Sequence, residues 1–466
     1  MSIHSFSIIR IIEKALDYVD PRLMNHGKHV AYLTYRVLKK QSRYNEGDIH
    51  KMLLVALLHD IGAYKTEEID KMLRFETQKV WEHSVYGYLF IKYFSPLPEM
   101  APAILFHHTS YDELEYLHPH YRGAAQIINI SDRFDVFLLY SGKSDMPHIK
   151  LLFEAKRGKE LSSDILDLFF MGEQVNPLIG IESDKEFHEI LYGRNFSSQE
   201  IDDFIKMLVL SIDFRSPQTV LHTFSAAYTC KAVSKILNID PGEQDRILTG
   251  MMLHDIGKIG IPGRILNKKD KLTSDEMAVI KKHVEITEDI LSGEVEKRVL
   301  KLAVRHHEKL DGSGYPMGLN AASLTRDERL IAIADIFSAL TGTRSYKDPF
   351  PKSKVVDILE SMALAGQIDQ DIVSVFIANY DGIITEVDRE TAPITEAYER
   401  LTAEYEELTH AVNLLGDPIK NEKEYEKNDS ALSRRGRKHA FWTSLTRPNP
   451  TPVHLDFYRD KTERCF

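Results

Sequence analysis

The sequence has little cysteine and no long apolar segment. Two cysteines, Cys230 and Cys465, occur in 466 residues. They are too few for a disulfide framework or a thiolate metal cluster, so we expect a reducing compartment, with the cytoplasm as the default. No run approaches ~18 apolar residues, and residues 1–20 mix charges into their apolar positions, unlike the apolar core of a signal peptide. We therefore expect neither a membrane-spanning segment nor a signal peptide.

An excess of positive charge is also missing. The chain has 59 basic and 70 acidic residues, a formal net charge of -11. This balance argues against binding to a nucleic-acid polymer, while a small anionic substrate held in a local metal site is compatible with it. The hydrophobic content of 43% is sufficient for folded cores, so we expect a globular protein.

Histidine, by contrast, is abundant, with 20 residues in all. Histidine and aspartate form two sets that follow the same order along the chain: His26, His59-Asp60, His83, His107-His108 and Asp132, then His222, His254-Asp255, His283, His306-His307 and Asp335. Matching positions lie 195 residues apart for His59 and His254 and 203 apart for Asp132 and Asp335, and the other pairs fall between these limits. This nearly constant spacing predicts one fold that occurs twice rather than a solenoid of short repeats.

The hydrophobic periodicity predicts an all-α protein. Residues 7–19, 29–40 and 244–255 have apolar side chains at i, i+3, i+4 and i+7, whereas alternating strand patterns are scarce. We expect two tandem helical domains, residues 1–195 and 196–400. Residues 401–466 are expected to form a helical extension and a poorly folded, charged tail.

The second set has the composition of a metal centre. Asp255 and Asp335 lie in strongly apolar helical patterns, and a buried carboxylate is costly unless a cation compensates it. Each residue alone has a simpler explanation, a hydrogen-bonded core histidine or a helix-capping aspartate, but the joint pattern favours ligands. Five histidines and two aspartates without cysteine suit Fe, Mn or Zn rather than structural zinc.

Seven ligands exceed what one ion needs. If Asp255 bridges two ions, one ion has His222, His254 and Asp335, and the other has His283, His306 and His307. Two ions about 3.5–4 Å apart generate a hydroxide near neutral pH and hold a phosphoryl group for in-line attack.

The second half resembles the HD-GYP family of bacterial cyclic-di-GMP phosphodiesterases, a branch of the HD metal-dependent phosphohydrolase superfamily. The likeness covers roughly residues 205–390 and includes, in the family's order, the blocks HDIGKIGIP, LTSDEMAVIKKH, HHEKLDGSGYP and ADIFSALTGTRSYK. It implies two tandem HD-type domains. The N-terminal one lacks the GYP loop, which is the segment that follows His307 and contains Gly314, Tyr315 and Pro316.

The resemblance also implies the reaction and the partners. A metal-bridging hydroxide would cleave a cyclic dinucleotide, cyclic di-GMP and/or 3',3'-cyclic GMP-AMP, to a linear dinucleotide. The cofactors would be two divalent metal ions, with Fe or Mn preferred to Zn, Ni or Mg. A diguanylate cyclase (GGDEF) protein and a second copy of the chain, in a homodimer, are further expected partners. The alternative is a catalytically inactive cyclic-dinucleotide sensor or a module that docks a diguanylate cyclase.

Roles of single residues follow from the same resemblance. His306 and His307 would be ligands of the second metal, and Lys258, together with Asp255, would be catalytic, with the lysine stabilising charge or protonating the leaving oxygen. Glycines at 312 and 314 permit unusual backbone conformations, and Pro316 stiffens the exit of the loop. The expected substrate-binding residues are Arg344 and Lys347, which hold phosphates, and Tyr315 and Gly314 at the edge of the site.

One departure from the family pattern is visible in the C-terminal set. Some members have a glutamate four residues before the first histidine, where it supports a third metal; Gln218 occupies this position, so we expect a two-metal centre.

The N-terminal copy keeps a complete potential ligand set: His26, His59, Asp60, His83, His107, His108 and Asp132. However, its lysine is shifted to Lys65, and TSYDELEYLHPHY replaces the GYP loop. Two hypotheses follow: a second phosphohydrolase site, such as a 5'-nucleotidase that acts on the linear product, or a degenerate regulatory or dimerisation domain.

Overall fold

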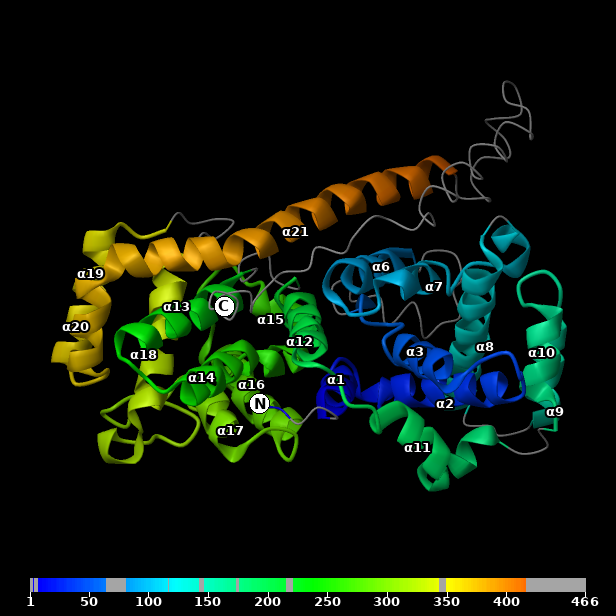
Figure 1. The fold of residues 1–466 in the computed structure, drawn as a ribbon, viewed down its shortest axis with the longest axis horizontal. Coiled ribbons are helices and arrows are strands. Elements are labelled where there is room, and N and C mark those ends of the chain that lie inside the picture. The colour runs from blue at the N-terminus through cyan, green and yellow to red at the C-terminus, as the bar shows by residue number, and fades with distance from the viewer. Residues whose placement is uncertain are drawn as a thin grey trace, which may run out of the picture.

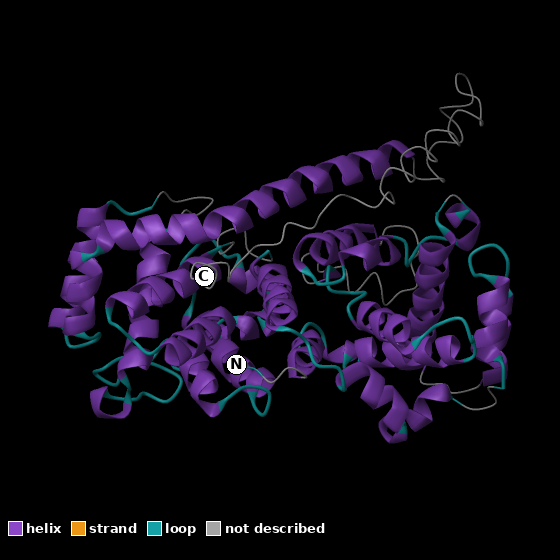
Figure 2. Ribbon diagram, viewed as in Figure 1, coloured by secondary structure: helices purple, strands orange, loops and turns teal. Residues whose placement is uncertain are grey.

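The structure, a computed structural model, describes residue 3 and residues 7–63, 81–115, 117–141, 146–172, 176–214, 221–342 and 349–415. Within these ranges the regular elements are all helices, and β-type pairing is limited to isolated bridges such as Ile3 with Val295 (Figure 2). The prediction of an all-α protein is confirmed. None of the described helices combines the length and the apolar character that a bilayer-spanning segment requires.

The first half of the chain packs around α2 (His26–Lys39). This helix contacts α3 (Glu46–Leu57) and α8 (Pro119–Ser141), and α6 (Trp81–Phe94) packs on α7 (Ala101–Leu105). The other α-helices that the structure describes in this half are α1 (Ser7–Asp17), α9 (Met146–Glu154), α10 (Ser163–Phe170) and α11 (Lys185–Tyr192).

The second half repeats this arrangement around α13 (His222–Ile236). This helix contacts α14 (Pro241–Leu253) and α18 (Arg326–Thr341), while α16 (Ser274–Leu291) packs on the short η5 (Ile256–Gly260) and on α17 (Lys297–Val304). The remaining helices are α12 (Ser198–Asp213), α15 (Gly263–Leu266), α19 (Lys352–Leu364), α20 (Gln370–Ala378) and α21 (Tyr380–Leu415).

Short sequence signals explain where several of these helices begin. Three of them, α12, α16 and α18, start with capping boxes in which a serine or threonine and a glutamate three residues later satisfy each other's backbone N–H groups.

The entries to α2 and α13 share a less common feature. Asn25 and Leu221, each directly before the first histidine of its set, are left-handed, with φ of 62° and 73°. This conformation is costly for leucine. The duplication therefore extends to the backbone geometry at the first predicted ligand.

Helix α21 joins the two halves (Figure 1). At its start it lies on α13, where Lys231 forms an ion pair with Glu390 at 2.8 Å. Further along it reaches α6, where Glu404 accepts hydrogen bonds from Lys92 at 2.6 Å and from the hydroxyl of Tyr93 at 2.6 Å. The predicted domain boundaries, 195 and 400, fall between α11 and α12 and within α21, respectively.

Candidate metal centres

The C-terminal centre is assembled from residues at the ends of three helices and within two others. His222 begins α13, His254 and Asp255 follow α14, His283 lies within α16, His306 and His307 follow α17, and Asp335 lies within α18. Ligand atoms of His222, His254 and Asp255 lie within 4.8 Å of one another, and so do those of His283, His306 and His307. These two groups hold six of the seven residues, with Asp255 in the first group where the sequence predicted Asp335. Asp335 lies next to this group, with Oδ1 3.1 Å from His222 Nε2 and 3.6 Å from His254 Nε2.

Both carboxylates lie between these groups. Asp255 Oδ2 is 3.1 Å from His254 Nε2, and Asp255 Oδ1 is 3.4 Å from His283 Nε2. Asp335 Oδ1 is 3.1 Å from His222 Nε2, while its Oδ2 is 3.7 Å from His307 Nδ1. The position of Asp255 suits the bridging role predicted for it. Asp335 also spans the two groups, which the sequence did not indicate.

The imidazoles are oriented by the backbone. The Nδ1 atoms of His254, His283 and His306 hydrogen-bond the carbonyl oxygen three residues earlier, at 2.6, 2.7 and 2.7 Å. A carbonyl only accepts, so each Nδ1 holds the proton and each Nε2 presents its lone pair to the centre. This second hydrogen bond is typical of metal-binding histidines.

Buried polar atoms test whether the site suits cations. His254 Nε2 and Asp255 Oδ1 are buried and lack a hydrogen-bond partner among the described residues. Burial raises the pKa of Asp255, but the neighbouring His254 and Lys258 outweigh it and hold this pKa well below its usual value. Burial and the adjacent His307 lower the pKa of His306. Burial lowers the pKa of His254, but Asp255 and Asp335 outweigh it and raise this pKa to about 10. The centre therefore favours positive charge beside its carboxylates, and a divalent metal ion in place of the proton would supply it.

Lys258 lies beside these ligands. Its Nζ donates to Asp255 Oδ2 from the next turn of chain, η5. Burial lowers the pKa of Lys258, but Asp255 raises it further, so the net shift is upward and the ammonium stays protonated at neutral pH. Gly257 lets η5 lie directly on α16, since a Cβ atom there would be 1.9 Å from the carbonyl oxygen of His283.

The GYP loop covers one side of the centre. The ring of Tyr315 lies on that of His307, with centroids 4.6 Å apart and planes at 39°, and Lys281 Nζ is 4.8 Å from the Tyr315 centroid. Gly312 has the positive φ, 79°, expected of a glycine turn. Gly314 is required for a different reason: a Cβ atom would lie 2.5 Å from the Cα of Glu308.

Sequence reasoning missed Glu308 and Lys281. Their positions, directly after the paired ligands and two residues before His283, were the available signals. Four residues discussed from the sequence lie outside the described residues, and their roles stay predictions: Lys65, Gln218, Arg344 and Lys347.

The N-terminal centre repeats the ligand geometry. One group contains His26, His59 and Asp132, and the other contains Asp60, His83, His107 and His108. His26 Nε2 is 3.3 Å from Asp132 Oδ1, and His59 Nε2 is 3.4 Å from Asp60 Oδ2.

Buried polar atoms without hydrogen-bond partners favour a cation in this centre as well. The Nε2 atoms of His26 and His59 and both oxygens of Asp60 are buried and have no hydrogen-bond partner in the described ranges. Burial lowers the pKa values of His26 and His59, but the neighbouring aspartates outweigh it and raise both. These atoms thus need positive charge, which protons on the imidazoles or a bound cation would supply. All seven predicted N-terminal residues therefore fit metal binding.

The two centres differ in what surrounds them. Asp135 accepts hydrogen bonds from Nδ1 of His26 at 2.7 Å and of His29 at 2.8 Å. In the second half the matching position is Ser338, whose oxygen lies 3.2 Å from His222 Nδ1. The first histidine of the N-terminal set is thus oriented by a carboxylate, and that of the C-terminal set by a hydroxyl.

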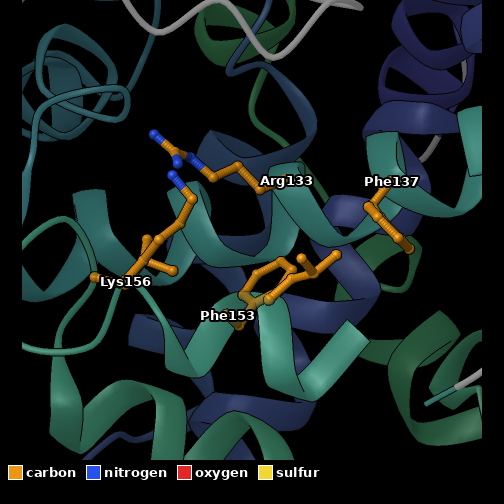
Figure 3. A pocket seen from close by; sticks show the side chains of 6 residues that line it. Arg133, Phe137, Phe153 and Lys156 are labelled. Carbon is orange, nitrogen blue, oxygen red and sulfur yellow. The ribbon is translucent and has the colours of Figure 1, made fainter. Parts of the chain in front are cut away.

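A cavity of about 230 Å³ lies in the first half of the chain, and Arg133, the residue after the predicted ligand Asp132, lines it (Figure 3). Its lining is mostly apolar and includes Phe137, Leu152, Phe153 and Leu161. Arg133 borders it, and its guanidinium is paired with Glu160 at 3.1 Å. The cavity contains none of the predicted ligands, so we do not consider it the catalytic site.

Comparisons with known proteins agree with this duplication. Models of the HD domain match residues 4–136 and, separately, residues 205–372. The chain is 28% identical over 393 residues to the 3'3'-cGAMP-specific phosphodiesterase 1 of Vibrio cholerae, covering 79% of this chain and 90% of the relative. It is 35% identical over 162 residues to the cyclic di-GMP phosphodiesterase response regulator RpfG of Xanthomonas campestris, covering 34% of this chain and 43% of the relative.

A solved structure has the same fold. The crystal structure of the cyclic GMP-AMP specific phosphodiesterase V-cGAP3 of V. cholerae matches with a TM-score of 0.53 and 18% identity, over 82% of this chain and 98% of the other. The chain belongs to the HD family of metal-dependent phosphohydrolases, as an HD-GYP protein with a second, N-terminal HD domain.

Proposed function

We propose that this protein is a metal-dependent phosphodiesterase that hydrolyses a cyclic dinucleotide, cyclic di-GMP and/or 3',3'-cyclic GMP-AMP, at its C-terminal centre. The observation that carries the proposal is the placement of Lys258 beside Asp255, a carboxylate that lies between two groups of histidines. A centre built only for structural metal binding would not need this protonated amine. The phosphodiesterases among the relatives support the same reaction class.

The residues fit two divalent ions, with Fe or Mn preferred to Zn, Ni or Mg. His222, His254 and Asp335 would hold one ion, His283, His306 and His307 the other, and Asp255 both. When bound, the ions supply positive charge to the phosphoryl oxygens and activate a water molecule.

The chain's own residues perform the remaining work. The ammonium of Lys258 neutralises charge that develops on the phosphoryl group or gives its proton to the leaving 3' oxygen. Water adds across one P–O bond, so the products are a 3' hydroxyl and a 5' phosphate on one linear dinucleotide. Tyr315 borders the space beside His307, and we assign phosphate binding to Arg344 and Lys347 because arginine and lysine suit phosphate.

The test is anion-exchange analysis of cyclic di-GMP and cyclic GMP-AMP, incubated separately with Mn- or Fe-loaded protein. We expect a linear dinucleotide from at least one substrate and none after Asp255→Ala, while Asp60→Ala should still produce the linear dinucleotide. Binding without cleavage by the metal-loaded wild type would instead support the alternative, a cyclic-dinucleotide sensor or a diguanylate cyclase-docking module.

The N-terminal centre has two candidate roles. Its acceptor-rich ligand set favours a metal-binding domain, either a 5'-nucleotidase that removes phosphate from the linear product or a regulatory domain. Loss of the dephosphorylated product after Asp60→Ala would assign the nucleotidase role, and a changed rate of the first cleavage would assign regulation.

We also propose a location and protein partners for this chain. The small number of cysteines favours the cytoplasm. We also propose diguanylate cyclase (GGDEF) proteins and a second copy of the chain as partners, which co-purification and light scattering would test.

A further inference from the structure

The GYP loop is closed around one buried carboxylate. Glu308, the residue after the ligand pair, is only 3% exposed although the loop lies at the surface. Its Oε1 accepts the backbone N–H of Met317 at 2.7 Å, and its Oε2 accepts that of Leu319 at 2.7 Å. Hydrogen bonds to a carboxylate are stronger than those between neutral groups. Glu308 therefore ties the end of the loop to its beginning.

The backbone between these points is folded onto the same residue. Gly314 lies so close to the Cα of Glu308 that a Cβ atom would approach it to 2.5 Å. The N–H of Tyr315 donates to the carbonyl oxygen of His307 at 3.2 Å. The segment that contains Tyr315 is thus held between the ligand His307 on one side and the carboxylate on the other.

This closure fixes the side chain of Tyr315. Its ring lies on His307 and is approached by Lys281 of α16, the helix that also contains the ligand His283. A shift of the backbone at 317 and 319 would move the ring away from both contacts. The N-terminal domain, which has no GYP loop, has Thr109 at the position that matches Glu308.

We propose that Glu308 is a positioning residue for the substrate side of the C-terminal centre. By accepting the N–H groups of Met317 and Leu319, it holds Tyr315 as a wall against which a base or sugar of the cyclic dinucleotide packs. The inference rests on the proposed function. Glu308 then matters for a substrate that fills the site and not for the binding of metal.

The first experiment compares two substrates in Glu308→Ala and Glu308→Gln. We expect kcat/KM for the cyclic dinucleotide to fall about 10²-fold in Glu308→Ala, because misplacement by about 1 Å has this effect. Hydrolysis of bis(p-nitrophenyl) phosphate, which is too small to need the wall, should stay within about two-fold, with unchanged metal content. Glu308→Gln keeps one acceptor, so its kcat/KM for the cyclic dinucleotide should lie between the values of the wild type and Glu308→Ala.

The matched control is Asp311→Asn. Asp311 also accepts a backbone N–H in this loop, from Ser313 at 2.9 Å, but its side chain is exposed and this bond spans only residues 311–313. The backbone of Asp311 pairs with Asn320, and the substitution leaves that pairing unchanged. Its variant should retain the activity on both substrates. Equal losses on the two substrates in Glu308→Ala, a loss of metal, or no loss at all would each overturn the inference.

A second measurement does not depend on activity. Hydrogen exchange followed by mass spectrometry should show slow exchange for the peptide containing the amides of residues 317 and 319. Exchange should be fast in Glu308→Ala, intermediate in Glu308→Gln and unchanged in Asp311→Asn. Rapid exchange in the wild type, or no change in Glu308→Gln, would overturn the closure. Failure of the wild type to cleave any cyclic dinucleotide would overturn the proposed function and is separate from both results.

Discussion

The two HD domains keep the same potential ligands but differ in the lysine position and in the loop after the paired histidines. Both have a buried aspartate among histidines, and in both a left-handed residue precedes the helix of the first histidine. In both, a glycine two residues after the first aspartate packs on the helix that contains His83 or His283. In the C-terminal domain Lys258 of η5 and the GYP loop lie beside the ligands. The N-terminal sequence has Ala63 at the position that matches Lys258 and no GYP sequence after His108. Metal binding and substrate handling are therefore separable features of this fold.

The comparison also shows a difference in how the first histidine is oriented. A carboxylate, Asp135, serves His26, and a hydroxyl, Ser338, serves His222. A carboxylate partner makes an imidazole a more basic ligand. The first histidine of the N-terminal domain is thus held by a charged partner, and that of the C-terminal domain by a neutral one.

The largest effect is expected from Lys258→Met. Removal of the ammonium beside Asp255 should lower kcat for the cyclic dinucleotide about 10²–10⁴-fold, the range for a lost acid or charge stabiliser. Metal content and any reaction of the N-terminal centre should be unchanged. Full activity in this variant would mean that the two centres do not differ in the way proposed, and quench-flow or chromatographic rates would decide it.

The next largest effect is expected from substitution of Gly62 and Gly257, each two residues after a predicted aspartate ligand. A Cβ atom at Gly257 would lie 1.9 Å from His283 O, and one at Gly62 would lie 2.0 Å from His83 O. Gly257→Ala and Gly62→Ala should each lower the free energy of unfolding by about 2–4 kcal/mol because backbone must move.

Chemical denaturation would measure these changes in unfolding free energy. Gly123→Ala in α8 is the control, since nothing lies within 4 Å of the added carbon, and it should be neutral or stabilising. Unequal effects at Gly62 and Gly257 would show that the duplication is less exact than the contacts indicate.

A smaller effect is expected from exchanging the partners of the first histidines. Asp135→Ser should weaken metal binding at the N-terminal centre about 10–100-fold, the usual result of losing such a partner. Ser338→Ala should change binding at the C-terminal centre less, because a neutral hydroxyl contributes less. Mn²⁺ titration by calorimetry, with Asp255→Ala and Asp60→Ala backgrounds to isolate each centre, would measure both.

The smallest effect concerns α12, which contacts both α6 and η5 and so lies between the two centres. Burial raises the pKa of Asp202 to about 6, with Lys206 opposing the shift. Because this folded-state pKa is above the unfolded value of about 3.9, stability falls as pH rises from about 4 to about 6 and stays lower above that range.

Asp202→Asn removes this dependence. Its unfolding free energy should exceed that of the wild type by about 1–2 kcal/mol at pH 7, after screening of the partly exposed side chain is allowed for, and by much less at pH 4. Thermal unfolding at the two pH values checks the sign. A variant less stable at pH 7 would show that Asp202 is stabilised as an anion.

The sequence by itself determined the helical class, the duplication and the two ligand sets. These depend on helical spacing and on the order of motifs, which are properties of neighbouring residues along the chain. His254 and Asp255 could be found in this way because they follow an apolar helix, and the lysine that follows them lies only one turn away.

Only the tertiary structure decided which atoms face one another. That Asp335 spans both ligand groups, that Glu308 closes the GYP loop, that Asp135 and Ser338 orient matching histidines differently, and that α21 joins the halves could not be predicted from local patterns. Most of these contacts join segments that are distant in sequence, and the Glu308 closure joins the two ends of one loop. Their approach is set by the packing of the helices and by the backbone path between them, which motifs do not specify.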